Sequence, residues 1–176
     1  MAEPITFTLA KQLGECANDS LVATSAGAPG RQCTLTAGSI VWDDCQCGQL
    51  SVTVPRIYNS QRFPVETVED GNASACGLPY LVMDVLISVL RCAPAIAPKA
   101  LAPTCDNMLG AALIWHEDAQ AVRRALGCCL RDMTEMDDIL SFTLGPTVAV
   151  GESGGCVGFE ITVKVGLPNC LCPPGP

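Results

Sequence analysis

The strongest constraint on the fold is a stretch near the C-terminus in which apolar and polar side chains alternate. In VGFEITVKV, residues 157–165, every odd position is apolar, and Glu160, Thr162 and Lys164 lie between. Because successive side chains of a β-strand point to opposite faces, this pattern predicts a strand with one face in the core. The preceding run FTLGPTVAV and the glycine-rich turn at 151–155 complete a predicted hairpin. The chain is therefore expected to contain an antiparallel sheet.

Two helices are expected to cover this sheet. Residues 7–24 repeat apolar side chains at helical spacing and lead into a Gly/Pro-rich turn. A second, longer helix is expected to begin with Thr104 or Asp106 as its cap and to run to about Met133. Its predicted core-facing stripe is Met108, Ala112, Trp115, Ala119, Val122, Leu126 and Cys129, and its predicted solvent-facing residues include Glu117, Asp118, Arg123, Arg124 and Arg131.

The remaining segments predict further strands and one long connection. YLVMDVLISVLR, residues 80–91, is apolar at alternate positions on both faces, which is typical of a central strand. Residues 40–42 and 50–54 read as two short extended pieces, and the turn-rich residues 56–79 predict a projecting hairpin or loop. We therefore expect an α+β fold with a mixed, largely antiparallel sheet. Residues 1–168 would form a single domain, and residues 169–176 a Pro/Cys-rich tail.

The composition indicates that part of the surface is covered by other subunits. Hydrophobic residues make up 49% of the 176 residues and charged residues only 16%, well below the roughly 25% usual for soluble domains. A net charge of -8 argues against a surface that grips nucleic acid, because such surfaces need clustered Lys and Arg. An acidic protein surface can still line a channel through which DNA passes without binding. We expect a ring-forming protein; a compact monomer with an uncharged polar surface is the alternative.

Twelve cysteines suggest use in oxidising surroundings, although the N-terminus lacks the pattern of a signal peptide. A protein made in a host cytoplasm and used in a virion would satisfy both observations. The pair Cys45 and Cys47 leaves three readings open, namely a zinc site, a redox pair or structural disulfides, and the C-x-C spacing favours disulfides. The candidate disulfide cysteines are Cys33, Cys45, Cys47, Cys76, Cys92, Cys105, Cys156, Cys170 and Cys172. By contrast, Cys16 and Cys129 lie on apolar helical stripes and are expected to be buried free thiols.

No arrangement of residues in the sequence predicts catalysis. His116 is the single histidine and falls in the middle of the second helix, so a Ser-His-Asp or Cys-His system has no second candidate base. The acidic run at 135–139 lacks the D-x-D-x-D-G pattern of a calcium loop, and the glycine-rich 151–158 precedes no helix. We expect no enzyme activity, no cofactor and no bound metal.

The order of elements, together with the phrases WDDCQCGQLSVTV, YNSQRFP, RCAP, HEDAQAVRRAL and GPTVAVGESGGCVGFEITVKVGLP, resembles neck proteins of long-tailed actinobacterial phages. Within that group the chain is most similar to the tail terminator, and the resemblance covers residues 7–167. It implies a lambda-type terminator fold, assembled as a hexameric ring. The cysteines and the final LCPPGP depart from the general terminator pattern, so their role is left open.

The resemblance implies that the protein caps the tail tube, ends its polymerisation and joins tail to head. Its partners would be copies of itself, the tail tube protein and the head stopper, with DNA passing through the channel unbound. Candidate interface residues are Arg56, Tyr58, Arg62 and Phe63, because Arg and aromatic residues are favoured at interface centres. Two alternatives remain: a head-side connector (adaptor or stopper), and a disulfide-rich or zinc-binding non-viral module. A membrane location is not expected.

Overall fold

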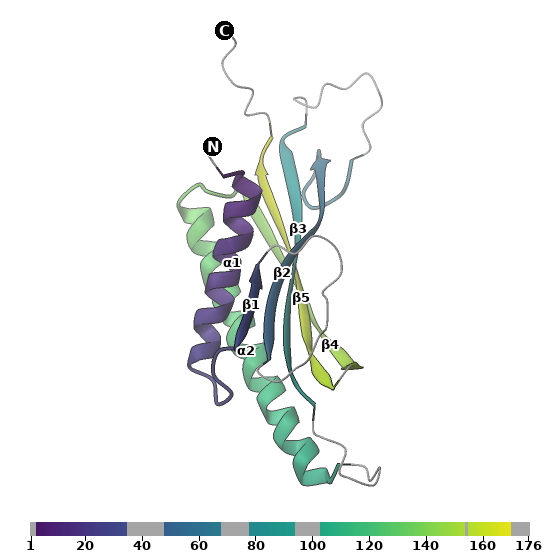
Figure 1. Cartoon of the computed structure of the whole chain (residues 1–176). Coiled ribbons are helices and arrows are strands. Elements are labelled where there is room, and N and C mark those ends of the chain that lie inside the picture. Colours follow the sequence, from purple (N-terminus) through teal and green to yellow (C-terminus); the bar gives the residue numbers. More distant parts are fainter. Residues whose placement is uncertain (1–2, 35–47, 68–77, 94–102, 154, 170–176) are drawn as a thin grey trace.

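The protein folds into two layers, with two helices packed on one face of a five-stranded sheet (Figure 1). The computed structural model describes residues 3–34, 48–67, 78–93, 103–153 and 155–169. The described elements are α1 (Ile5–Val22), β1 (Arg31–Thr34), β2 (Gln49–Ser60), β3 (Tyr80–Cys92), α2 (Cys105–Glu135), β4 (Ser141–Ser153) and β5 (Cys156–Pro168). The predicted α+β class, with an N-terminal helix and a longer second helix, is confirmed.

The sheet has the strand order β1-β2-β3-β5-β4. Only β1 and β2 run parallel, and the other neighbours are antiparallel. The alternating stretch that predicted β5 behaves as expected: Phe159, Ile161 and Val163 are almost completely buried on the helix-facing side. In β3, Val82 and Leu90 are buried as well as the helix-facing residues, as predicted for a central strand.

The core lies between the sheet and the two helices. The apolar stripe of α1 contributes Leu9, Leu13, Ala17 and Leu21, and α2 contributes Val122, Leu126 and Leu130. Thr104 caps α2, since its side-chain oxygen accepts a hydrogen bond from the backbone N–H of Asn107, which otherwise has no partner within the helix. This cap agrees with the first of the two predicted cap residues.

The predicted core stripe of α2 is wrong at its N-terminal end. The first turns of the helix extend beyond the end of the sheet (Figure 1), so Met108 is 57% exposed and Ala112 is also exposed. Asp118, predicted to face solvent, is instead only 1% exposed. The helical spacing was read correctly, but helix and sheet are in contact over only part of the length of α2.

The strands at the start of the sheet also differ from the prediction. β1 was not expected, and β2 is longer than the predicted 50–54 because it continues to Ser60. The projecting segment predicted for 56–79 therefore begins inside a strand, and the β2–β3 connection starts at Gln61. Residues 40–42 and 68–77 lie outside the described residues.

One disulfide joins the two helices. Cys16 of α1 and Cys129 of α2 are bonded across a sequence separation of 113 residues. The prediction that both are buried free thiols is wrong, because each apolar stripe faces the other helix and this brings the two Cα atoms within 6.6 Å.

Candidate functional site

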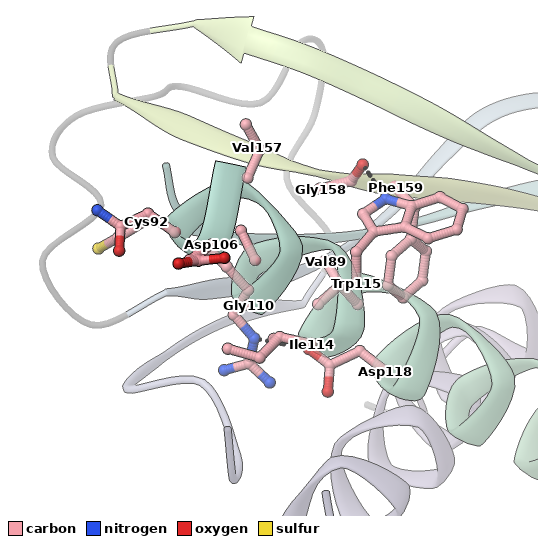
Figure 2. A pocket seen from close by; sticks show the side chains of 13 residues that line it. Val89, Cys92, Asp106, Gly110, Ile114, Trp115, Asp118, Val157, Gly158 and Phe159 are labelled. Atoms are coloured by element: carbon pink, nitrogen blue, oxygen red, sulfur yellow. Dashed lines mark hydrogen bonds and ion pairs between the residues drawn. The ribbon is translucent and has the colours of Figure 1, made fainter. Parts of the chain in front are cut away.

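The N-terminal half of α2 separates from the sheet and leaves a cleft. A cavity of about 470 Å³ opens there between α2 and the ends of β3 and β5. Its walls are mostly apolar, and Figure 2 shows Ile114, Trp115 and Phe159 among the side chains that line it. A second, smaller hollow of about 310 Å³ lies between the same helix and β4, and it shares Trp115.

Trp115 lies at the point along α2 where the helix begins to separate from the sheet. Its indole Nε1 donates a hydrogen bond of 2.7 Å to the carbonyl of Gly158, and its ring packs edge-on against Phe159 at a centroid distance of 5.9 Å (Figure 2). Gly158 is required at this position, because a Cβ atom there would lie 1.9 Å from the carbonyl oxygen of Val89. The two strands lie too close together here for any side chain, and the carbonyl of Gly158 accepts the hydrogen bond from the indole.

An ion pair closes the inner wall of the larger cavity. Arg91 Nε donates to Asp118 Oδ2 at 2.8 Å, and Arg91 Nη2 donates to the carbonyl of Gly27 at 2.7 Å. The second carboxylate oxygen, Oδ1, is buried without a hydrogen-bond partner among the described residues. This pair was not predicted, because the helical spacing placed Asp118 on the solvent face. The available sign was its position about one helical turn after Trp115, which the same spacing predicted to face the core.

The face of the sheet opposite the helices carries a polar cluster centred on Asp84. Asp84 Oδ1 accepts a hydrogen bond from Lys164 Nζ at 3.0 Å, and Oδ2 accepts one from Arg56 Nη2 at 2.8 Å. Tyr58 lies between the two cations and donates its hydroxyl hydrogen to the carbonyl of Pro64. Arg56, Asp84 and Lys164 occupy one row across β2, β3 and β5, so the sheet register brings them together.

The cluster changes the acid–base behaviour of both cations. Partial burial by itself would lower the pKa of Lys164, but its hydrogen bonds to Asp84 and Tyr58 outweigh burial and raise that pKa above its usual value. The hydrogen bond to Asp84 likewise raises the pKa of Arg56. Both side chains are held in the charged form, as expected of a structural cluster and not of a group that exchanges protons.

The four candidate interface residues lie on β2 and on the turn that follows it. Arg56 and Tyr58 belong to the Asp84 cluster, whereas Phe63 packs its ring on Tyr80 at a centroid distance of 6.0 Å. Arg62 is exposed at the tight turn after β2. Arg56 and Arg62 are therefore accessible to a partner, and Tyr58 and Phe63 mainly order the turn from within.

The candidate disulfide cysteines are placed as follows. Cys33 and Cys105 carry free thiols, so the predicted disulfides are not present at these positions. Cys33 lies opposite Ser51 in the register, and Cys105 is exposed at the start of α2. Cys92 is exposed, and Cys156, its cross-strand neighbour, is disulfide-bonded. The remaining candidates, Cys45, Cys47, Cys76, Cys170 and Cys172, lie outside the described residues.

Neither the cleft nor the polar cluster contains a group of metal ligands. Among the described residues, no three His, Cys, Asp or Glu side chains gather in a way that would hold a metal ion. His116 is exposed on α2, and its ring stands nearly perpendicular to that of Trp115 at a centroid distance of 4.9 Å. None of the described helices is long and apolar enough to cross a membrane.

Together these features define a two-layer α+β fold with an apolar cleft and an exposed helix end. No known protein family matches this sequence, and no curated protein is similar to it.

Proposed function

We propose that this chain is a structural subunit of a phage neck, a tail terminator that caps the tail tube as a ring and joins tail to head. The observation that carries the proposal is the free N-terminal half of α2. Met108, Leu109 and Leu113 are 57%, 60% and 62% exposed there, beside the apolar cleft. Monomeric proteins rarely expose a contiguous apolar patch of this kind, and such patches mark protein–protein contacts.

The charge distribution agrees with a role in which DNA passes by. The net charge of -8 would keep a polyanion from adhering to the protein. Within α2, the exposed N-terminal half carries acidic side chains and no Lys or Arg before Arg123. A purely structural role also requires no catalytic group, and the proposal assigns none.

The proposal is tested first on the purified protein. Native mass spectrometry and negative-stain electron microscopy should show a closed ring of about six copies. A monomer at all concentrations up to the millimolar range would overturn the proposal. Stoichiometric zinc in a metal analysis would instead favour the non-viral module.

Terminator and connector are separated in a phage that carries the gene. Deletion should yield particles with overlong tails, because nothing then stops polymerisation of the tube. Filled heads that leak DNA beside tails of normal length would overturn the terminator assignment and indicate a head-side connector.

A further inference from the structure

The larger cavity, between α2 and the ends of β3 and β5, combines a mostly apolar wall with a polar atom that lacks a partner. Val89 and Phe159 of the wall are almost completely buried, and Ile114 and Trp115 complete its apolar part from α2. Concave, mostly apolar cavities of this size, with a few polar groups in their walls, are typical sites for small molecules. The cavity of about 470 Å³ therefore has the form of a ligand site.

The polar atom without a partner belongs to Asp118, which lines the same cavity. Oδ2 accepts the hydrogen bond from Arg91, but Oδ1 is buried and has no hydrogen-bond partner among the described residues. Trp115 cannot supply the donor, because its Nε1 already donates to the carbonyl of Gly158. An ionised carboxylate accepts hydrogen bonds on both oxygens, and a buried polar atom without a partner costs free energy. A ligand that brings a donor to Asp118 would therefore bind favourably.

The charges of the wall favour an uncharged donor. The guanidinium of Arg91 and the carboxylate of Asp118 form an ion pair at 2.8 Å, so their charges largely cancel. A charged group placed beside this pair would lose its hydration without gaining a counterion of its own, which is unfavourable in an apolar cavity. The third charged residue of the wall, Asp106, is exposed in the first turn of α2, where solvent screens its charge.

The aromatic side chains of the wall favour an aromatic ligand. The rings of Trp115 and Phe159 both line the cavity and stand nearly perpendicular to each other (Figure 2). Aromatic rings pack well against one another edge to face or in offset stacks. We propose that the cavity binds a small uncharged aromatic molecule with one N–H or O–H group, which packs on Trp115 and Phe159 and donates to Asp118 Oδ1. The inference goes beyond the proposed function and does not rest on it.

The first test compares two ligands that differ mainly in the donor. Indole carries an N–H group, and benzofuran has nearly the same shape with an oxygen atom in its place. Each is titrated into the isotope-labelled protein, and binding is followed by the NMR signal of the indole N–H group of Trp115, which Trp115→Phe assigns. A hydrogen bond to a charged acceptor should make indole bind about ten- to a hundredfold more tightly than benzofuran.

The second test fills the cavity. Gly110 lines the cavity, and a Cβ atom built there has open space around it in the described part of the structure. Gly110→Phe should place a ring in the cavity and abolish the binding of indole. Gly127→Phe is the matched control, because Gly127 lies in the same helix with the same open space but does not line the cavity. Phenylalanine favours a helix more than glycine does, so thermal unfolding should show both variants folded.

Three outcomes would overturn the inference. Equal affinities for indole and benzofuran would show that the ligand donates no hydrogen bond to Asp118. Failure of indole to bind at its solubility limit would show that the cavity is not a site for this class of molecule. Binding that persists in Gly110→Phe would place the site elsewhere. Whether the wild-type protein forms a ring bears on the proposed function alone, so the two proposals can fail separately.

Discussion

At the scale of single residues, the buried ion pair of Arg91 in β3 with Asp118 in α2 contributes to stability. Asp118 is 1% exposed, and the Arg91 side chain is 15% exposed. Removing one member of a buried pair leaves the other charge unpaired, which costs about 3 to 5 kcal/mol. We expect Arg91→Met to lower the free energy of unfolding by about 3 kcal/mol in urea titrations. Arg124→Met, at an exposed position of α2, should change the free energy of unfolding little. If both variants lowered it by the same amount, the prediction would be wrong.

The Asp84 cluster gives a pH-dependent prediction at the same scale. The folded-state pKa of Lys164 lies above its ordinary value of 10.5. The stability that Lys164 contributes is therefore fully present below pH 10.5 and is lost as the pH rises through the folded-state pKa. Lys164→Met should cost about 1 to 3 kcal/mol at pH 8, and its difference from wild type should shrink above pH 10.5. Chemical denaturation at each pH measures this; Lys11→Met, an exposed lysine of α1, should show no such convergence.

At the scale of elements, the disulfide between α1 and α2 holds the helix layer together. Closing a loop of this length restricts the unfolded chain and stabilises the fold by about 4 to 5 kcal/mol in the chain-entropy model. We expect the double variant Cys16→Ser with Cys129→Ser to lose about that much, measured by urea unfolding. Cys128→Ser, which changes an exposed free thiol next to the disulfide, should be neutral. A double variant as stable as wild type would contradict this prediction.

The elements also show what could be predicted from the sequence. β5 and β3 were predictable because their apolar alternation reports burial directly, and α2 because its spacing and Thr104 cap are local features. β1 was not predictable, since RQCT is short and does not alternate. The burial of Asp118 depended on Arg91, 27 residues earlier and in another element, and the Cys16–Cys129 disulfide depended on how two helices pack. A local sequence pattern does not predict such long-range pairings.

At the scale of the whole molecule, the exposed N-terminal end of α2 should determine whether the protein is a monomer or an oligomer. Its Leu109 and Leu113 are 60% and 62% exposed beyond the sheet. If this surface is buried between subunits, the double variant Leu109→Glu with Leu113→Glu places two charges in an apolar contact and should dissociate the proposed ring. Because neither side chain is buried within one chain, thermal unfolding of the dissociated subunit should still be cooperative.

The control for this variant lies on the same helix at its other end. Met136, the residue that caps the C-terminus of α2, is 65% exposed, so Met136→Glu adds a charge of the same kind at a comparable exposure. Sedimentation velocity over a range of protein concentrations should give a smaller particle for the double leucine variant only. If both variants dissociate, net charge and not the location of the apolar surface controls assembly. If neither does, the projecting half of α2 faces solvent in the ring, and the subunits are joined elsewhere.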